Sequence, residues 1–133
     1  MTAAVDSSII LDVLLDDPNY AEISMHLLQE YLVKGAVIIS PVAFAECAAA
    51  LKSPSDFQGV AREMGLIYKP FTQEACSLAA KSWRQYRTKG GTKQRILADF
   101  LIGAHAQTLA GTLLTRDRGF YKEYFRDLHV ITS

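Results

Sequence analysis

Two short apolar runs in this chain stop at a polar residue and pass directly into a helix-like pattern. Residues 3–5 end at Asp6, and residues 36–39 end at Ser40, a residue that can cap a helix whose first turn holds Pro41. Strands that alternate with amphipathic helices are typical of a parallel sheet with helices on both faces. The chain is therefore expected to adopt an α/β fold.

The rest of the chain continues this alternation. Further strands are expected at 66–68, 112–115 and 129–132, which gives a central, mostly parallel sheet of about four to five short strands. Gly90 and Gly91 interrupt the helical pattern, so residues 88–95 are expected to form a loop. Helices are expected over residues 9–15, from a capping box at Asn19 and Glu22 to about 35, over 42–51, from 53 to about 65, over 72–86, and over 96–109.

Composition places the chain among ordinary globular proteins. It has 133 residues, of which 50% are hydrophobic and 21% charged, so a single domain over residues 1–133 is expected. Lys plus Arg and Asp plus Glu both number 14, and net charge is therefore uninformative about partners. Cys47 and Cys76 lie in helix-like apolar stretches and are expected to be buried thiols. With neither a signal-peptide pattern nor a long apolar run, the protein is expected to be cytoplasmic, without membrane contact.

Four carboxylates stand in apolar surroundings: Asp6, Glu46, Asp99 and Asp117. An acid near a core costs free energy unless a cation or hydrogen bonds replace its hydration. The local patterns put Asp6 and Asp117 at the carboxyl ends of strands, where ligands bind in open parallel sheets. The helices that carry Glu46 and Asp99 can reach the same edge. Because Mg²⁺ and Mn²⁺ prefer carboxylate oxygens, the four acids predict a divalent-metal site.

The surroundings of Asp99 support that interpretation. At helical spacing Asp99 shares a face with Gly103 and Ala106, whose small side chains would leave room for an ion and its waters. A close helix–strand contact is the competing explanation for the glycine. Ser8 and Thr115 are expected to orient carboxylates or waters around the ion.

Each acid also has an ordinary explanation. Asp6 is a good helix cap, and Glu46 can simply face solvent on its helix. Asp117 lies between Arg116 and Arg118, so a surface salt bridge can satisfy it without a metal. A non-catalytic interaction module whose acids only cap helices is therefore one alternative.

Basic residues gather on both sides of the acids in sequence. Several Lys and Arg fall between residues 81 and 95 with no acid among them, and more surround Asp117. Aromatic residues such as Trp83 and Tyr121 are interleaved with them, a mixture that suits phosphates and unpaired bases, although the aromatics can equally belong to the core. The candidate RNA-binding residues are Arg87, Lys93, Arg95, Arg116 and Arg118.

Four segments together resemble one known family. Residues 5–8, 40–46, 95–106 and 113–120 resemble, in the same order, the PIN-domain ribonucleases, specifically VapC-type toxins of type II toxin–antitoxin pairs. The resemblance implies a PIN-like three-layer sandwich. It also implies a Mg²⁺- or Mn²⁺-dependent endoribonuclease that acts on RNA, forms a homodimer and is inhibited by a small cognate antitoxin.

The resemblance also implies roles for single residues. Asp6, Glu46, Asp99 and Asp117 match the acidic metal-binding positions of the family, and are expected to be catalytic. Thr115 matches the Ser or Thr that precedes the last acid. Many relatives carry Asn where this chain has Ser8.

The leading hypothesis is hydrolysis of an RNA phosphodiester by water activated on a divalent ion. Asp6, Asp99 and Asp117 would be the main ligands, and Glu46 would complete the shell or orient the water. The second enzymatic hypothesis is a phosphatase or phosphotransfer domain with Asp6 as nucleophile. That chemistry favours a second acid two residues later, where this chain has Ser8.

Overall fold

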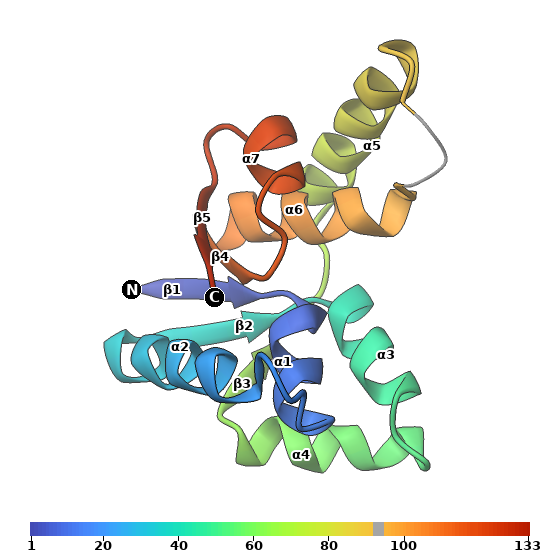
Figure 1. Cartoon of the computed structure of the whole chain (residues 1–133). Coiled ribbons are helices and arrows are strands. Elements are labelled where there is room, and N and C mark those ends of the chain that lie inside the picture. Colours follow the sequence, from blue (N-terminus) through green and yellow to red (C-terminus); the bar gives the residue numbers. More distant parts are fainter. Residues whose placement is uncertain (92–94) are drawn as a thin grey trace.

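The protein is built around a five-stranded parallel sheet, seen in a computed structural model that describes residues 1–91 and 95–133 (Figure 1). The strands run in the order β3-β2-β1-β4-β5, and every neighbouring pair is parallel. The predicted α/β class and parallel sheet are therefore confirmed. The strands are β1 (Thr2–Val5), β2 (Ala36–Ile39), β3 (Leu66–Tyr68), β4 (Thr112–Thr115) and β5 (His129–Thr132).

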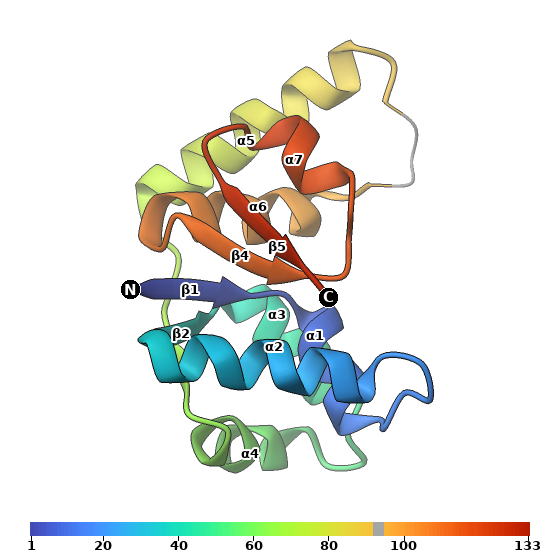
Figure 2. The ribbon, with the colours of Figure 1, turned by 60° about the vertical axis from the view of Figure 1, so that its left-hand side comes forward.

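Helices cover both faces of the sheet. Helices α1 and α2 lie on one face and α5 and α6 on the other, as the two views of the ribbon show (Figures 1 and 2), and this gives the expected three layers. Within the described parts of the chain, none of the helices is long and apolar enough to cross a membrane. The helices are α1 (Ser7–Leu14), α2 (Ala21–Lys34), α3 (Pro41–Ala49), α4 (Phe57–Glu63), α5 (Gln73–Thr88), α6 (Leu97–Leu109) and α7 (Phe120–Tyr124), with a 3-10 turn at Pro54–Asp56.

The strand order creates a switch point between β1 and β4. From β1 the chain winds outward through β2 to β3, and then returns to the opposite side of β1 as β4. Ligands of open α/β sheets bind beyond the carboxyl ends of the strands at such a point. The backbone N–H of Asp6 donates to the carbonyl of Leu114 at 2.9 Å, which continues the pairing past the end of β1. Asp6 and Asp117, the first and the last of the predicted acids, therefore follow two strands that are neighbours in the sheet.

The central strands are buried on both faces. Ala3, Val5, Leu113 and Leu114 are at most 2% exposed, which explains why their sequences are almost continuously apolar. A polar residue that directly follows such a strand therefore lies next to the core. The position of Asp6 is thus a consequence of the buried strand before it.

Two of the expected helix caps are formed. The Ser40 hydroxyl accepts a hydrogen bond from the N–H of Ala43, and the Thr72 hydroxyl accepts one from the N–H of Ala75, both at 3.1 Å. Each satisfies one of the backbone donors that a helix start leaves unpaired. The local sequence therefore fixes where α3 and α5 begin.

The capping box expected at Asn19 and Glu22 is wrong. Helix α2 begins at Ala21, and no side chain caps it. Instead, the carboxylate of Asp17 accepts hydrogen bonds from the N–H groups of Asn19 and Tyr20, at 2.8 and 2.9 Å. A turn stabilised by Asp17 thus precedes the helix, which begins one residue later than the predicted box implies.

Helix α7 was not expected from the sequence, and it changes the role of the aromatic residues. Phe120, Tyr121 and Phe125 are buried, and the ring of Phe120 lies 5.0 Å from that of Phe100 on α6, edge to face. These rings pack on one another. Of the two alternatives left open for the aromatic residues, burial in the core is therefore the one that holds for these three side chains.

The space expected at Gly103 is filled by another side chain. A Cβ on Gly103 would overlap the ring of Phe125, which is 1% exposed. The glycine therefore permits close packing of α6 against Phe125, a residue at the end of α7, rather than the helix–strand contact that was the competing explanation. Of the two cysteines, Cys47 is buried as expected, whereas Cys76 is exposed.

Candidate metal centre at the carboxyl edge of the sheet

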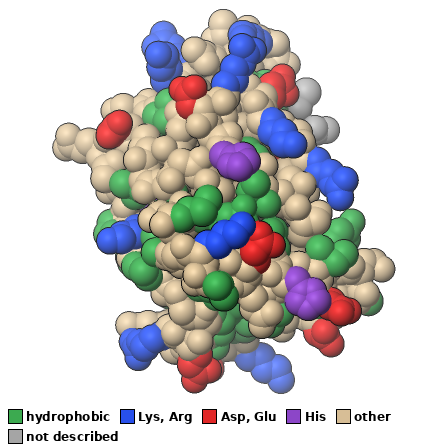
Figure 3. Space-filling model, turned by 90° about the vertical axis from the view of Figure 1, so that its left-hand side faces the viewer, with side chains coloured by type: hydrophobic (Ala, Val, Ile, Leu, Met, Phe, Trp, Pro, Cys, Tyr) green, Lys and Arg blue, Asp and Glu red, His purple; other side chains and the backbone are tan. Residues whose placement is uncertain are grey.

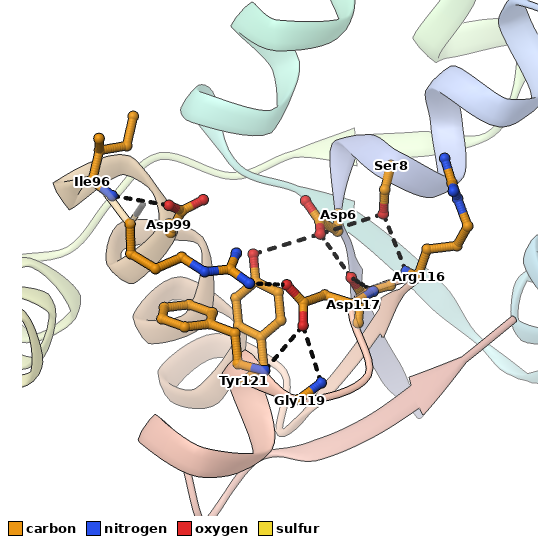
Figure 4. A network of polar contacts seen from close by, with 11 residues as sticks. Asp6, Ser8, Ile96, Asp99, Arg116, Asp117, Gly119 and Tyr121 are labelled. Atoms are coloured by element: carbon orange, nitrogen blue, oxygen red, sulfur yellow. Dashed lines mark hydrogen bonds and ion pairs between the residues drawn. The ribbon is translucent and has the colours of Figure 1, made fainter. Parts of the chain in front are cut away.

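Asp6 directly follows β1 and is 7% exposed (Figure 4). Its carboxylate accepts a short hydrogen bond from the hydroxyl of Thr115, at 2.7 Å, and longer ones from Ser8, at 3.4 Å, and Tyr121, at 3.5 Å. Although it occupies the N-cap position of α1, its side chain makes no cap hydrogen bond. Capping therefore does not account for this acid.

The charge of Asp6 lacks a cationic partner among the described residues. Burial raises the pKa of Asp6, hydrogen bonds from Thr115, Ser7 and Ser8 oppose that rise, and the nearby charge of Asp117 adds to it. Neutral hydroxyls replace only part of the hydration that a carboxylate loses on burial. The site would be stabilised by an added cation.

Asp117 follows β4 and is held by three donors. One oxygen, Oδ1, accepts the N–H groups of Gly119 at 3.1 Å and Phe120 at 3.0 Å, and the other, Oδ2, accepts the guanidinium of Arg95 at 2.7 Å. Burial alone would raise the pKa of Asp117, but these backbone hydrogen bonds and Arg95 together hold it below its usual value. Its ion-pair partner is thus Arg95 rather than either flanking arginine.

Glu46 and Asp99 approach the same edge from α3 and α6. The Glu46 carboxylate accepts the hydroxyl of Ser7 at 2.9 Å, and Asp99 accepts the N–H of Ile96 at 3.0 Å. Burial, followed by the charges of Asp6 and Asp99, raises the pKa of Glu46 in spite of the Ser7 hydrogen bond. The four predicted acids therefore influence one another, although they come from four different elements.

The acids share a region without forming a finished ligand shell. Figure 4 shows Asp6, Asp99 and Asp117 at one edge of the sheet, on different elements. In residues 1–91 and 95–133, no three His, Cys, Asp or Glu side chains are arranged to hold a metal ion. The donor set nevertheless fits Mg²⁺ or Mn²⁺, because it consists of hard carboxylate oxygens and includes a buried carboxylate without a cation.

Thr115 connects the ends of the two central strands. Its hydroxyl donates to Asp6 at 2.7 Å and accepts the N–H of Asp117 at 3.0 Å. Ser8 has a similar double role, since its hydroxyl donates to Asp6 and accepts the N–H of Arg116 at 3.2 Å. Both hydroxyls orient the carboxylate of Asp6.

Sequence reasoning missed two residues of this region. Ser7 bridges Asp6 and Glu46, and its position directly after the strand-end acid was a signal that could have indicated it. Tyr121 places its hydroxyl 3.5 Å from Asp6, and burial together with the charges of the acids raises its pKa. No local pattern indicated Tyr121, because α7 itself was not expected.

A third missed residue, Asp12, forms an ion pair with Arg116, one of the predicted RNA-binding residues. Asp12 is 2% exposed, and its carboxylate accepts hydrogen bonds from Nε of Arg116 at 2.9 Å and from the hydroxyl of Ser24 at 2.7 Å, while Nη2 of Arg116 lies 2.8 Å away as its ion-pair partner. The guanidinium of Arg116 also lies over the ring of Tyr20, 4.2 Å from its centroid. Arg116 is therefore held by the fold.

The other predicted cations lie in different settings. Arg95 bonds Asp117, Arg118 donates to the carbonyl of Ser133 at 3.3 Å, and Arg87 lies over the Trp83 ring at 5.2 Å. Lys93 falls outside the described residues. Of the three described cations, only Arg95 is placed directly against one of the candidate metal-binding acids.

The fold and this edge define a class: a parallel α/β protein whose acids meet at the switch point of the sheet. Residues 3–125 match the PIN domain, and the chain belongs to this family, whose members are generally nucleases. The predicted PIN domain is thus confirmed.

Solved structures of proteins from several bacteria have the same fold. The VapBC2 structure from Rickettsia felis, bound to a promoter DNA fragment, has a TM-score of 0.73 at 18% identity, over 100% of this chain and 99% of that one. The structure of VapBC-1 from nontypeable Haemophilus influenzae has a TM-score of 0.73 at 16% identity, over 99% of this chain and 98% of that one. The structure of FitAcB from Neisseria gonorrhoeae has a TM-score of 0.68 at 22% identity, over 98% of this chain and 96% of that one. Among curated proteins, no sequence matches the chain significantly. The similarities to solved structures therefore establish the fold.

Proposed function

We propose that this protein is a Mg²⁺- or Mn²⁺-dependent endoribonuclease and the toxin of a toxin–antitoxin pair. Membership of the PIN family supports a nuclease. The observation that carries the metal-dependent chemistry is Asp6, a carboxylate 7% exposed at the switch point of the sheet, with Thr115 but no cation against it among the described residues. Such a charge is expected where an ion is to be bound.

Each acid has a proposed role. Asp6, Asp99 and Asp117 would hold the ion, and Glu46 would complete its surroundings or orient a water. A bound divalent ion polarises a phosphoryl oxygen and lowers the pKa of a bound water. The hydroxyl of Thr115 holds the carboxylate of Asp6 in place at 2.7 Å.

The RNA is proposed to follow one side of α5. Lys81, Arg84 and Lys89 are exposed, line a shallow hollow of about 480 Å³, and pair with no acid of the described chain. We call these three residues the α5 basic face. Figure 3 shows several Lys and Arg side chains at the upper end of the molecule, the end at which Figure 1 places α5. Exposed, unpaired cations suit the phosphates of a single strand.

The α5 basic face refines the earlier candidates. Arg95 and Arg118 remain proposed phosphate contacts close to the acids. Arg87 and Arg116 are engaged with Trp83 and Asp12, so they are weaker candidates.

A small antitoxin is proposed as the partner. Two of the solved structures with this fold are VapBC complexes, and the resemblance implies inhibition by a bound antitoxin. An apolar groove of about 410 Å³ between α1, α2 and α4 offers a surface for an amphipathic helix. Its apolar lining includes Leu14, Met25, Leu32, Val60 and Met64. A homodimer is proposed on the same resemblance.

Cleavage of RNA by the purified protein tests this function. A labelled single-stranded RNA is incubated with Mn²⁺ and wild type, Asp6→Asn or Asp99→Asn. Asp56→Asn is the control, because Asp56 is an exposed acid on the 3-10 turn and is not one of the four candidate ligands. Loss of a metal ligand is expected to reduce the cleavage rate at least about 100-fold, whereas the control keeps the wild-type rate. Wild-type cleavage by Asp6→Asn would exclude the proposed mechanism.

A further inference from the structure

Arg95 is the only cation that pairs with any of the four candidate acids in the described chain. Its Nη2 lies 2.7 Å from Oδ2 of Asp117, and its guanidinium carbon lies 4.3 Å above the centre of the Phe120 ring. Asp6, Glu46 and Asp99 are contacted by hydroxyl or backbone N–H donors. A protein side chain therefore already supplies positive charge at this edge.

The arrangement around Asp117 leaves one oxygen for an ion, and Arg95 occupies it. Oδ1 accepts two backbone N–H groups, from Gly119 and Phe120, so its lone pairs are used. Oδ2 accepts Arg95. A metal ion that uses Asp117 must therefore take Oδ2, where its positive charge would repel the guanidinium of Arg95 and favour its departure.

Arg95 can leave at small cost. The pair has a single hydrogen bond, and the side chains of Arg95 and Asp117 are 34% and 22% exposed. Ion pairs that water reaches contribute little to stability. The replacement of a guanidinium by a divalent ion is therefore compatible with the fold.

A released Arg95 would face the proposed path of the RNA. Arg95 lines a surface hollow of about 460 Å³ together with Lys89 and Gly91, and Glu123 is the acid on its described lining. Lys89 also belongs to the α5 basic face. The hollow thus connects that face with the acids, and Arg95 stands where the two meet.

We infer that Arg95 is an exchangeable counter-ion: it holds Asp117 in the metal-free protein, and a divalent ion displaces it toward an RNA phosphate. This inference rests on the proposed function. Arg95 would then be a positioning residue that couples metal binding to RNA binding. Since linkage is reciprocal, the metal raises the affinity for RNA and RNA raises the affinity for the metal.

Calorimetric titration of Mn²⁺ into wild type, Arg95→Met and Arg95→Lys tests the exchange. Lys122→Met is the matched control, because it removes one exposed positive charge on α7 without touching Asp117. Arg95→Met is expected to lower the Kd for Mn²⁺ about fivefold, the upper end of what an ion pair that water reaches contributes. Arg95→Lys is expected to lie between it and wild type, and the control within about twofold of wild type. Thermal unfolding verifies that each variant is folded.

RNA binding supplies the second readout. The anisotropy of a labelled phosphorothioate RNA is measured with EDTA and with Mn²⁺. Without metal, Arg95→Met is expected to bind like wild type, because Arg95 is engaged with Asp117. With Mn²⁺, wild type is expected to gain several-fold more affinity than Arg95→Met.

The outcomes separate this inference from the proposed function. An unchanged Mn²⁺ affinity in Arg95→Met, or an equal shift in Lys122→Met, overturns the exchange even if wild type cleaves RNA with Mn²⁺. If neither wild type nor Arg95→Met binds Mn²⁺ and wild type cleaves no RNA, both the metal-dependent function and the exchange are wrong.

Discussion

Helix α1 and the residue before it carry two buried acids that the fold treats differently. Asp12 is 2% exposed, forms an ion pair and a hydrogen bond with Arg116, and accepts a second hydrogen bond from Ser24. Asp6 is 7% exposed, and its carboxylate accepts hydrogen bonds from the hydroxyl groups of Thr115 and Ser8. A buried charge that serves stability is expected to have its counter-ion within the fold. The charge of Asp6 is not neutralised in this way, which points to a partner from outside.

The largest expected difference between the two acids is their response to a metal. With Mn²⁺ at about 100 times its Kd, wild type should gain about 2.7 kcal/mol in free energy of unfolding. Asp12→Asn should gain the same amount, and Asp6→Asn should gain almost none. Urea unfolding with Mn²⁺ and with EDTA measures these differences. An equal gain in Asp6→Asn would place the ion elsewhere.

Loss of the charge at Asp12 should destabilise the protein by about 2–3 kcal/mol. The amide of Asp12→Asn offers one acceptor oxygen to Arg116 and turns its NH₂ toward the other guanidinium donors. Because the Arg116 side chain is 36% exposed, water can hydrate its guanidinium, which offsets part of the lost free energy of unfolding. Urea unfolding in EDTA measures the effect. A cost below about 0.5 kcal/mol would show that the pair is not important for stability.

The hydroxyls beside the two acids form a matched pair. Ser24 donates to Asp12 and Thr115 donates to Asp6, both at 2.7 Å. Ser24→Ala should cost about 0.5–1 kcal/mol, because Arg116 still neutralises Asp12, whereas Thr115→Val should cost about 1–2 kcal/mol. Chemical unfolding of the two variants in one buffer tests the order. The reverse order would contradict the view that Asp6 depends on neutral donors.

The smallest expected effect has the opposite sign. Without metal at pH 7, Asp6→Asn should be more stable than wild type by about 1 kcal/mol, because the folded state no longer contains an uncompensated charge. The pKa of Asp6 is raised above its unfolded value of 3.8, so the folded state binds the proton at higher pH. Wild type therefore gains stability relative to the variant as pH falls through the raised pKa. Unfolding at pH 7 and pH 5 should show the difference shrink.

Local sequence was sufficient for the strands and for the acids that follow them. The apolar run before Asp6 fixes a buried strand, and the capping chemistry of Ser40 fixes where α3 begins. These features depend on neighbours in the chain, so periodicity and capping preferences indicate them.

Long-range pairings explain what local sequence did not indicate. Arg95 and Asp117 are 22 residues apart, and Arg116 and Asp12 are 104 apart. Nothing near Arg116 in sequence shows that its partner is on α1 rather than on RNA. For the same reason Gly103 suggested space, whereas the tertiary structure fills that space with Phe125.

The contact between Gly103 and Phe125 also sets a dimension of the site. Asp99 lies one helical turn before Gly103 on the same helix. Since any side chain at Gly103 would overlap a buried ring, α6 would have to move away from Phe125. Asp99 would move with it, while Asp6 and Asp117 stay on the sheet. Glycine at position 103 therefore helps to set the distance of Asp99 from Asp6 and Asp117.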